Sequence, residues 1–130
     1  MIIELDNTSA IPIYVQLRNQ IVLGIGRGEL KVGESLPTVR QMAADAGINV
    51  MTVNKAYNVL KLEGYIEIDR RHGAIVSPKL DNSKEYCEKF ENELELLITE
   101  ASLKGMKKEE FLERCSALYE RQNIVVMGGA

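Results

Sequence analysis

Five side chains on one face of an expected helix are of types that contact nucleic acid: Met51, Thr52, Asn54, Lys55 and Asn58. Thr and Asn side chains can hydrogen-bond to base edges, and Lys can contact guanine or neutralise a phosphate. An exposed Met51 can pack on the methyl group of thymine. This set predicts contact with double-stranded DNA. The other interpretation, an ordinary solvated helix face, stays open on the helix alone.

The helix that carries this set is predicted from its opposite face. Its apolar residues recur at helical spacing and form a stripe that can face a core. Asn49 is a good N-cap for this helix, and Gly64 closes it. The stripe consists of Val53, Ala56, Tyr57 and Leu60.

A shorter helix is expected directly before it. Thr38 and Gln41 have the spacing of a capping box, in which each side chain can bond the other residue's backbone N–H. Gly47 stands where a left-handed residue would end the helix. The two helices and their tight turn predict a helix-turn-helix, whose second helix can lie in the DNA major groove. The apolar face of the shorter helix consists of Val39, Met42, Ala43 and Ala46.

A β-hairpin with a basic tip is expected after the helix pair. Residues 65–69 alternate as a half-buried strand does, and residues 74–77 form a second strand. A basic tip can reach phosphates or enter a minor groove, although a charged surface hairpin would have the same composition. The order of three helices and a basic hairpin describes a winged helix. The tip residues are Arg70, Arg71, His72 and Gly73.

The first of those three helices is expected after Pro12, which suits a first helical turn. Gly26 and Gly28 end it, and residues 30–36 follow as a loop with one short strand. Its apolar stripe consists of Ile13, Leu17, Ile21 and Ile25.

These segments together resemble the GntR family of bacterial transcription regulators, over roughly residues 10–77. The short remainder resembles the YtrA-type branch, whose small helical tail pairs two subunits. The chain departs from the family pattern at Val50 and Met51, where relatives usually have more polar or turn-forming residues, and at Arg71, where a second glycine is usual. The matching residues are 12–17, 28–40, 47–49, 52–57, Leu60, Glu63 and Gly64.

The resemblance also implies roles for individual residues. Arg40 resembles the family's phosphate- or base-contacting arginine. Thr52 and Lys55 occupy DNA-facing positions, and His72 and Gly73 lie at the wing tip.

Residues 79–130 are expected to form a two-helix tail. Ser83 can cap a helix that runs to about Leu103, and Gly105 separates it from a second helix. The apolar stripes exceed what one hairpin of helices can bury, so we expect two chains to pair as a symmetric dimer. A tail folded back on its own domain is the alternative. The expected dimerisation residues are Phe90, Leu94, Leu97, Ile98, Ala101, Phe111, Leu112, Cys115, Leu118 and Tyr119.

The apolar segment from Ile124 to Met127 allows three readings, namely a short strand, part of the interface or a frayed end. The expected architecture is therefore an α+β winged helix-turn-helix domain over residues 1–78, followed by an all-α dimerisation tail over residues 79–130.

The net charge of −3 is unevenly distributed. Residues 1–78 hold 8 Lys and Arg against 8 Asp and Glu, whereas residues 79–130 hold 8 against 11. The acidic excess thus lies outside the expected DNA-binding domain. A neutral domain predicts modest non-specific electrostatic binding, so we expect recognition to depend on dimer symmetry and specific contacts.

Several classes of protein are disfavoured by the sequence. No stretch approaches the roughly 18 apolar residues of a membrane span, and a signal-peptide pattern is missing, so a cytoplasmic location is expected. Cys87 and Cys115 are interpreted as half-buried tail residues, with a redox switch as the alternative, and paired zinc-ligand spacing is absent. We expect no metal, no cofactor and no catalytic activity, because no nucleophile–base arrangement or Gly-rich phosphate loop is recognisable.

The sequence therefore predicts a homodimeric, sequence-specific DNA-binding regulator, a repressor of a small operon that reads a near-palindromic operator. The resemblance alone suggests transporter genes as targets. The alternative is a winged-helix module that binds protein without binding DNA. An unidentified small-molecule effector is a further expected partner, with no residue set that identifies it.

Overall fold

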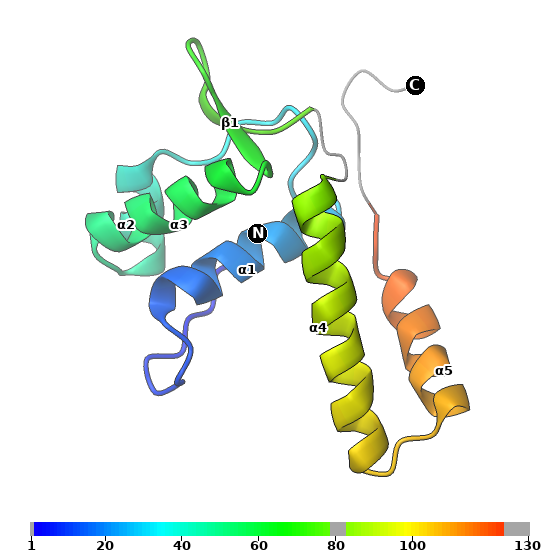
Figure 1. Ribbon diagram of the computed structural model, residues 1–130. Coiled ribbons are helices and arrows are strands. Elements are labelled where there is room, and N and C mark those ends of the chain that lie inside the picture. The colour runs from blue at the N-terminus through cyan, green and yellow to red at the C-terminus, as the bar shows by residue number, and fades with distance from the viewer. Residues whose placement is uncertain (1, 79–82, 124–130) are drawn as a thin grey trace. The chain divides into compact units, whose positions relative to one another are not determined.

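Three helices, a hairpin and two further helices follow one another along the chain (Figure 1). The computed structural model describes residues 2–78 and 83–123. These form two compact units, one of residues 2–78 with Asn123 and the other of residues 83–122. The elements are α1 (Ile13–Gly26), α2 (Val39–Ala46), α3 (Val50–Leu62), β1 (Ile66–Asp69), β2 (Gly73–Val76), α4 (Lys84–Leu103) and α5 (Lys108–Tyr119).

The core of the first unit lies between α1, α2, α3 and the base of the hairpin. All four residues of the predicted α3 stripe are buried. On α1, the stripe is buried at three of its four positions, and Ile13 at the helix start is half-buried. Pro12 is the N-cap of α1 rather than a residue of its first turn. The largest fully buried side chains are Leu17, Ile21, Met42, Val53, Leu60, Ile66 and Val76.

The start of α2 and the turn between α2 and α3 have backbone caps that the sequence predicted. The Thr38 hydroxyl accepts a hydrogen bond from the Gln41 backbone N–H at 3.1 Å. Gly47 ends α2 at φ +69°, a conformation that costs glycine no Cβ clash. The Asn49 side chain accepts from the Met51 N–H at 2.7 Å and so caps α3.

One half of the predicted capping box is wrong. The Gln41 side chain does not return to Thr38 but donates to Asp45 Oδ1 at 2.9 Å, one helical turn onward. Residues four apart face each other on a helix, so the Asp45 carboxylate is an available acceptor for the Gln41 amide.

The hairpin follows α3 and extends beyond the three helices (Figure 1). Its strands are antiparallel, with Ile66 opposite Val76 and Asp69 opposite Gly73. The first strand begins one residue later than predicted and ends at Asp69 as predicted, whereas the second strand is shifted one residue toward the N-terminus, because Gly73 already pairs with Asp69. The hydrogen-bond ladder nevertheless reaches the predicted ends, since the Ser77 N–H donates to the Tyr65 carbonyl at 2.9 Å.

The segment before α2 pairs with the outer edge of β2, on the side opposite β1. The Gly33 N–H donates to Val76 O at 2.8 Å, and the Leu36 N–H donates to Ala74 O at 2.8 Å. Ser35 and Ile75 form an antiparallel bridge. The short strand expected within residues 30–36 is thus not a full strand but an isolated β-bridge to β2.

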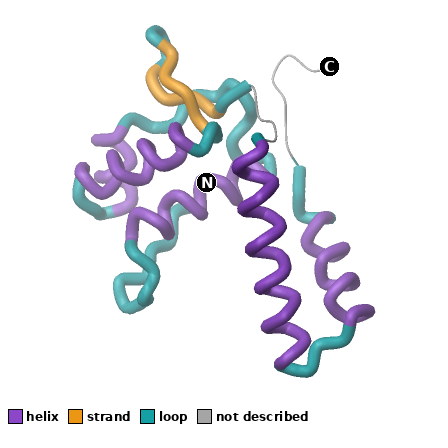
Figure 2. The backbone as a smooth tube through the Cα atoms, in the orientation of Figure 1, coloured by secondary structure: helices purple, strands orange, loops and turns teal. Residues whose placement is uncertain are grey.

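Helices α4 and α5 lie side by side and run in opposite directions in the second unit (Figure 2). The Ser83 hydroxyl accepts from the Tyr86 N–H at 3.0 Å, which confirms the predicted cap of α4. Gly105, at φ +92°, forms the turn to α5. The apolar segment from Ile124 to Met127 lies outside the described residues. Within the described part, we find no helix with the length and apolarity to cross a membrane.

Candidate nucleic-acid interface

Helix α3 has two chemically distinct faces. The face opposite its buried stripe exposes Met51, Asn54, Lys55 and Asn58, and it leaves Thr52 half-buried. The Met51 side chain is 76% exposed. The residues that the sequence singled out for DNA contact therefore lie together on the outer side of this helix.

The Lys55 ammonium group is held by an aromatic ring of α1. Its nitrogen lies 4.2 Å from the centre of the Tyr14 ring, within the range of a cation–π interaction. Sequence reasoning missed Tyr14 as a site residue, because no local pattern connects a residue of α1 with one of α3. The Tyr14 ring thus orients the Lys55 cation on this outer face of α3.

An open hollow of about 370 Å³ lies on the same surface. Met51, Thr52 and Lys55 line it from α3, and Ile13 and Tyr14 line it from the start of α1. The hollow combines one ammonium and one hydroxyl group with apolar side chains. It is therefore suited to a ligand that presents both apolar and anionic groups.

Arg40 lies in the first turn of α2 and is exposed. Its side chain forms no ion pair with any residue in the described part of the chain. The guanidinium group is thus accessible from solvent, and its contact with a phosphate or a base stays a prediction from the resemblance.

The wing tip is ordered by a carboxylate. Asp69 Oδ1 accepts from the Arg71 N–H at 2.7 Å, from the His72 N–H at 3.1 Å and lies 3.2 Å from His72 Nδ1. The backbone N–H of Arg71, followed by that of His72, lowers the pKa of the Asp69 carboxyl group. Gly73 completes the turn at φ +71°. Asp69 was missed, although an Asp that opens a turn is a recognisable Asx-turn signal.

All four predicted tip residues, Arg70 to Gly73, are exposed. The arginine side chains at the tip have no ion-pair partner among residues 2–78 and 83–123. Asp69 is only partly exposed and is turned toward the backbone of the tip, so its charge offsets the two arginines without pairing with them.

A buried tyrosine fixes α3 against the segment before α2. The Tyr57 hydroxyl donates to the Pro37 carbonyl at 2.8 Å. Burial raises the pKa of Tyr57 to about 12, so the hydroxyl stays a neutral donor at physiological pH. This bond helps to set the position of α3 relative to Thr38 and α2.

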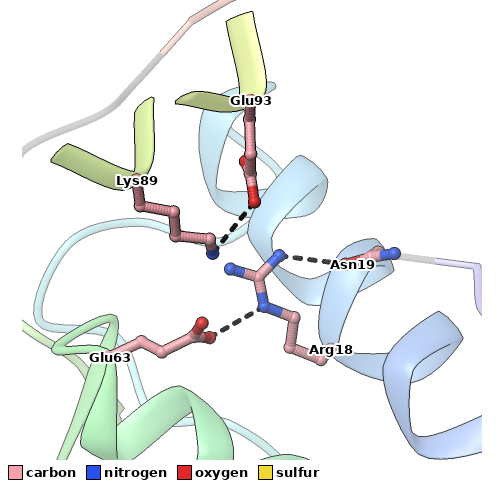
Figure 3. A network of polar contacts seen from close by, with 5 residues as sticks. All are labelled: Arg18, Asn19, Glu63, Lys89 and Glu93. Atoms are coloured by element: carbon pink, nitrogen blue, oxygen red, sulfur yellow. Dashed lines mark hydrogen bonds and ion pairs between the residues drawn. The ribbon is translucent and has the colours of Figure 1, made fainter. Parts of the chain in front are cut away.

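Arg18 of α1 contacts Glu63 at the C-terminal end of α3 (Figure 3). Its Nε donates to Glu63 Oε1 at 2.8 Å, and its Nη1 donates to Asn19 Oδ1 at 2.9 Å. The guanidinium also lies 5.4 Å from the centre of the Tyr65 ring. The Arg18 side chain therefore connects α1 with the end of α3 and with Tyr65.

The predicted dimerisation residues lie on α4 and α5, and neither helix buries a residue. Leu94, Ala101, Phe111 and Cys115 are half-buried. The others are exposed: Phe90, Leu97, Ile98, Leu112, Leu118 and Tyr119. Figure 3 also draws the ion pair between Lys89 and Glu93 within α4, at 3.9 Å.

Both cysteines are free, Cys115 half-buried as expected and Cys87 exposed, contrary to the half-buried expectation. Tyr86, next to Cys87, and Phe90 are exposed as well. Within the described residues, no group of three or more His, Cys, Asp or Glu side chains could hold a metal ion.

Comparison with known protein families identifies a family that covers the candidate interface. The family described as "Bacterial regulatory proteins, gntR family" matches residues 12–76. This range contains α1, α2, α3 and both hairpin strands, and so all the residues of the candidate interface.

Individual relatives extend the similarity into the tail. The HTH-type transcriptional regulator YhcF of Bacillus subtilis is 34% identical over 81% of this chain and 88% of its own length. The HTH-type transcriptional repressor YtrA of the same organism is 34% identical over 85% and 87%. The solved structure of YtrA from Sulfolobus acidocaldarius, a GntR-family transcription factor, is 36% identical and covers 91% of this chain and 97% of that one, with a TM-score of 0.58.

Proposed function

This chain belongs to the gntR family of bacterial regulatory proteins, in its YtrA-type branch, and from that premise we propose that it is a homodimeric repressor of a small operon. It is a DNA-binding transcriptional regulator with a winged helix-turn-helix fold. The proposal adds the sign of regulation, the oligomeric state, the domain roles and a near-palindromic operator.

The observation that carries the proposal is the division of α3 into two faces. Four side chains anchor the helix in the core, and the opposite face presents Asn54, Lys55 and Asn58 to solvent. In a helix-turn-helix the second helix contacts base edges with its N-terminal part. The exposed cations of Arg40 and of the wing tip are in the same unit and can contact phosphates beside that groove.

The dimer is proposed from the second unit. An apolar stripe on two helices without one buried residue is typical of a surface that another subunit covers. Two paired tails would carry two copies of residues 1–78, one for each half-site. Half-sites separated by about 10 base pairs would then place both α3 helices in successive major grooves.

The repressor role is proposed from similarity. YtrA of Bacillus subtilis is named a transcriptional repressor, and the similarity spans most of both chains. A dimer seated on an operator can act by excluding polymerase. Transporter genes are the proposed targets on the family resemblance.

Selection of bound sequences from random duplex DNA at physiological salt tests this proposal. We expect recovery of a near-palindrome with half-sites about one helical turn apart. Recovery of no sequence above background would overturn operator binding. Salt-insensitive association with a protein, without binding to any duplex, would favour the protein-interaction module instead.

Substitutions on the recovered operator then test the reading surface. Arg40→Ala and Thr52→Ala are each expected to weaken operator binding by roughly 1–3 kcal/mol, as the loss of a good specific contact does. Arg27→Ala is the matched control, because Arg27 is an exposed arginine at the end of α1. Unchanged operator affinity in both test variants, with the fold intact by circular dichroism, would refute the assignment of the reading helix.

A further inference from the structure

The N-terminal end of α3 presents apolar side chains where a DNA-reading helix commonly presents polar ones. Val50 is 41% exposed and Met51 is 76% exposed. The side-chain oxygen of Asn49, the polar residue before them, is already used to cap the helix at the Met51 N–H. The helix start therefore offers hydrocarbon and a thioether to its surroundings.

The hollow beside Met51 has the same character. Ile13 and Tyr14 form its α1 wall, and Lys55 lies one helical turn after Met51 on the same face of α3. The Lys55 ammonium lies over the Tyr14 ring, and both residues line the hollow. Lys55 therefore places a positive charge at its border. Met51 remains largely uncovered by other side chains.

The major groove has one exposed apolar group, the 5-methyl group of thymine. A flexible, polarizable methionine side chain fits such a group well, and a nearby ammonium suits the adjoining phosphate. We propose that Met51 is a specificity-determining residue that reads the 5-methyl group of one thymine in each operator half-site. This inference rests on the proposed operator binding.

The experiment uses the full-length protein and the operator recovered by selection. Each thymine of a half-site is replaced in turn by deoxyuridine, which removes only the 5-methyl group. We expect one position at which this replacement weakens wild-type binding about three- to fivefold, the value of one buried methyl group. Competition against the unmodified duplex measures the change.

Met51→Ala completes the test. This variant is expected to bind the unmodified operator more weakly and to lose the discrimination between thymine and deoxyuridine at that one position. Met51→Leu, which restores hydrocarbon, is expected to recover part of the discrimination. Leu62→Ala is the control, because Leu62 is 87% exposed at the opposite end of α3.

The outcomes separate the two proposals. Equal binding of every deoxyuridine duplex by the wild-type protein would overturn the role of Met51 while leaving operator binding intact. Discrimination that persists in Met51→Ala would also overturn it, since the methyl group would then be read elsewhere or through DNA shape. Failure of the wild-type protein to bind any duplex would instead refute the proposed function.

Discussion

The two units of this chain use the same amphipathic helix pattern to different ends. In residues 2–78, the apolar faces of three helices and a hairpin meet in one core. In residues 83–122, two helices of similar amphipathic character bury no side chain. Helical periodicity predicts which face of a helix is apolar, but it does not say whether the chain itself provides the cover for that face.

The exposed apolar residues of the two units are also arranged differently. In the first unit, the exposed large apolar residues are spread over several elements, such as Met51 and Leu62 at the two ends of α3 and Ile68 in β1. In the second, the exposed apolar residues follow the helical repeat along α4, as Phe90 and Leu97 do. Scattered apolar residues are normal on a protein surface, whereas a continuous stripe is typical of an interface. We therefore expect the first unit to stay folded when the protein is diluted. The stability of the second unit should depend on pairing with another subunit.

The largest effect is expected in the core of the first unit. Leu60→Ala removes a fully buried side chain of α3 and should lower the free energy of unfolding by about 2–5 kcal/mol. Leu62→Ala, two residues later and exposed, should change it by less than about 0.5 kcal/mol. Urea denaturation followed by circular dichroism measures both. Similar losses in the two variants would break the contrast between a complete core and an uncovered surface.

The next effect is expected in subunit pairing. Leu97→Lys places a charge in the apolar stripe of α4 and should weaken dimerisation by about 2 kcal/mol, within the range for burying a leucine. Thr99→Lys adds the same charge on the opposite face of the helix and serves as the control. Sedimentation equilibrium measures the association. A wild-type protein that is monomeric at all concentrations would show that the second unit is not a dimerisation tail.

A smaller effect is expected at the start of α5. Lys107 is the N-cap of this helix and makes no side-chain capping bond, although its extended backbone suits one. Lys107→Asp should supply the missing acceptor and stabilise α5 by up to about 1 kcal/mol. Slower hydrogen exchange of the backbone amides in the first turn of α5 would show this increase in helix stability. Unchanged exchange would mean that the second unit is limited by packing rather than by local helix stability.

The smallest effect on stability is expected at the wing tip, when the Asp69 carboxyl group is protonated in acid. Its pKa lies below the ordinary value of 3.8, so the carboxylate stabilises the turn above that value. This stabilisation is lost as the pH falls through the lowered pKa. The amide resonances of Arg71 and His72 should therefore shift together in an acid titration followed by NMR. Asp69→Asn should abolish that shift, and amides that titrate unchanged in this variant would refute the assignment.

The parts of this structure that the sequence predicted well depend on neighbours within one helical turn. Thr38, Gly47 and Asn49 define the helix-turn-helix through contacts at most four residues away. Ser83 and Gly105 do the same for the tail. The stripe of α3 was predictable because any core-facing helix obeys the same period.

The parts that could not be predicted depend on how elements pack. The contact of Lys55 with Tyr14 and that of Tyr57 with Pro37 join side chains that only the fold brings together. The Gln41 side chain could accept from the Thr38 backbone N–H or donate to the Asp45 carboxylate, and the sequence did not decide between these two bonds. The assignment of individual residues to DNA contact stays a prediction, because it depends on a ligand as well as on the fold.

The bridging of residues 33–36 along β2 also bears on the behaviour of the protein at high concentration. An uncovered strand edge can recruit a strand from another molecule and so begin aggregation. Here one side of β2 is covered by β1 and the other by the Gly33–Leu36 segment. The outer edge of β1 carries Glu67 and Asp69 within four residues, and charged side chains disfavour strand addition. The wing can therefore project into solvent without seeding intermolecular sheets.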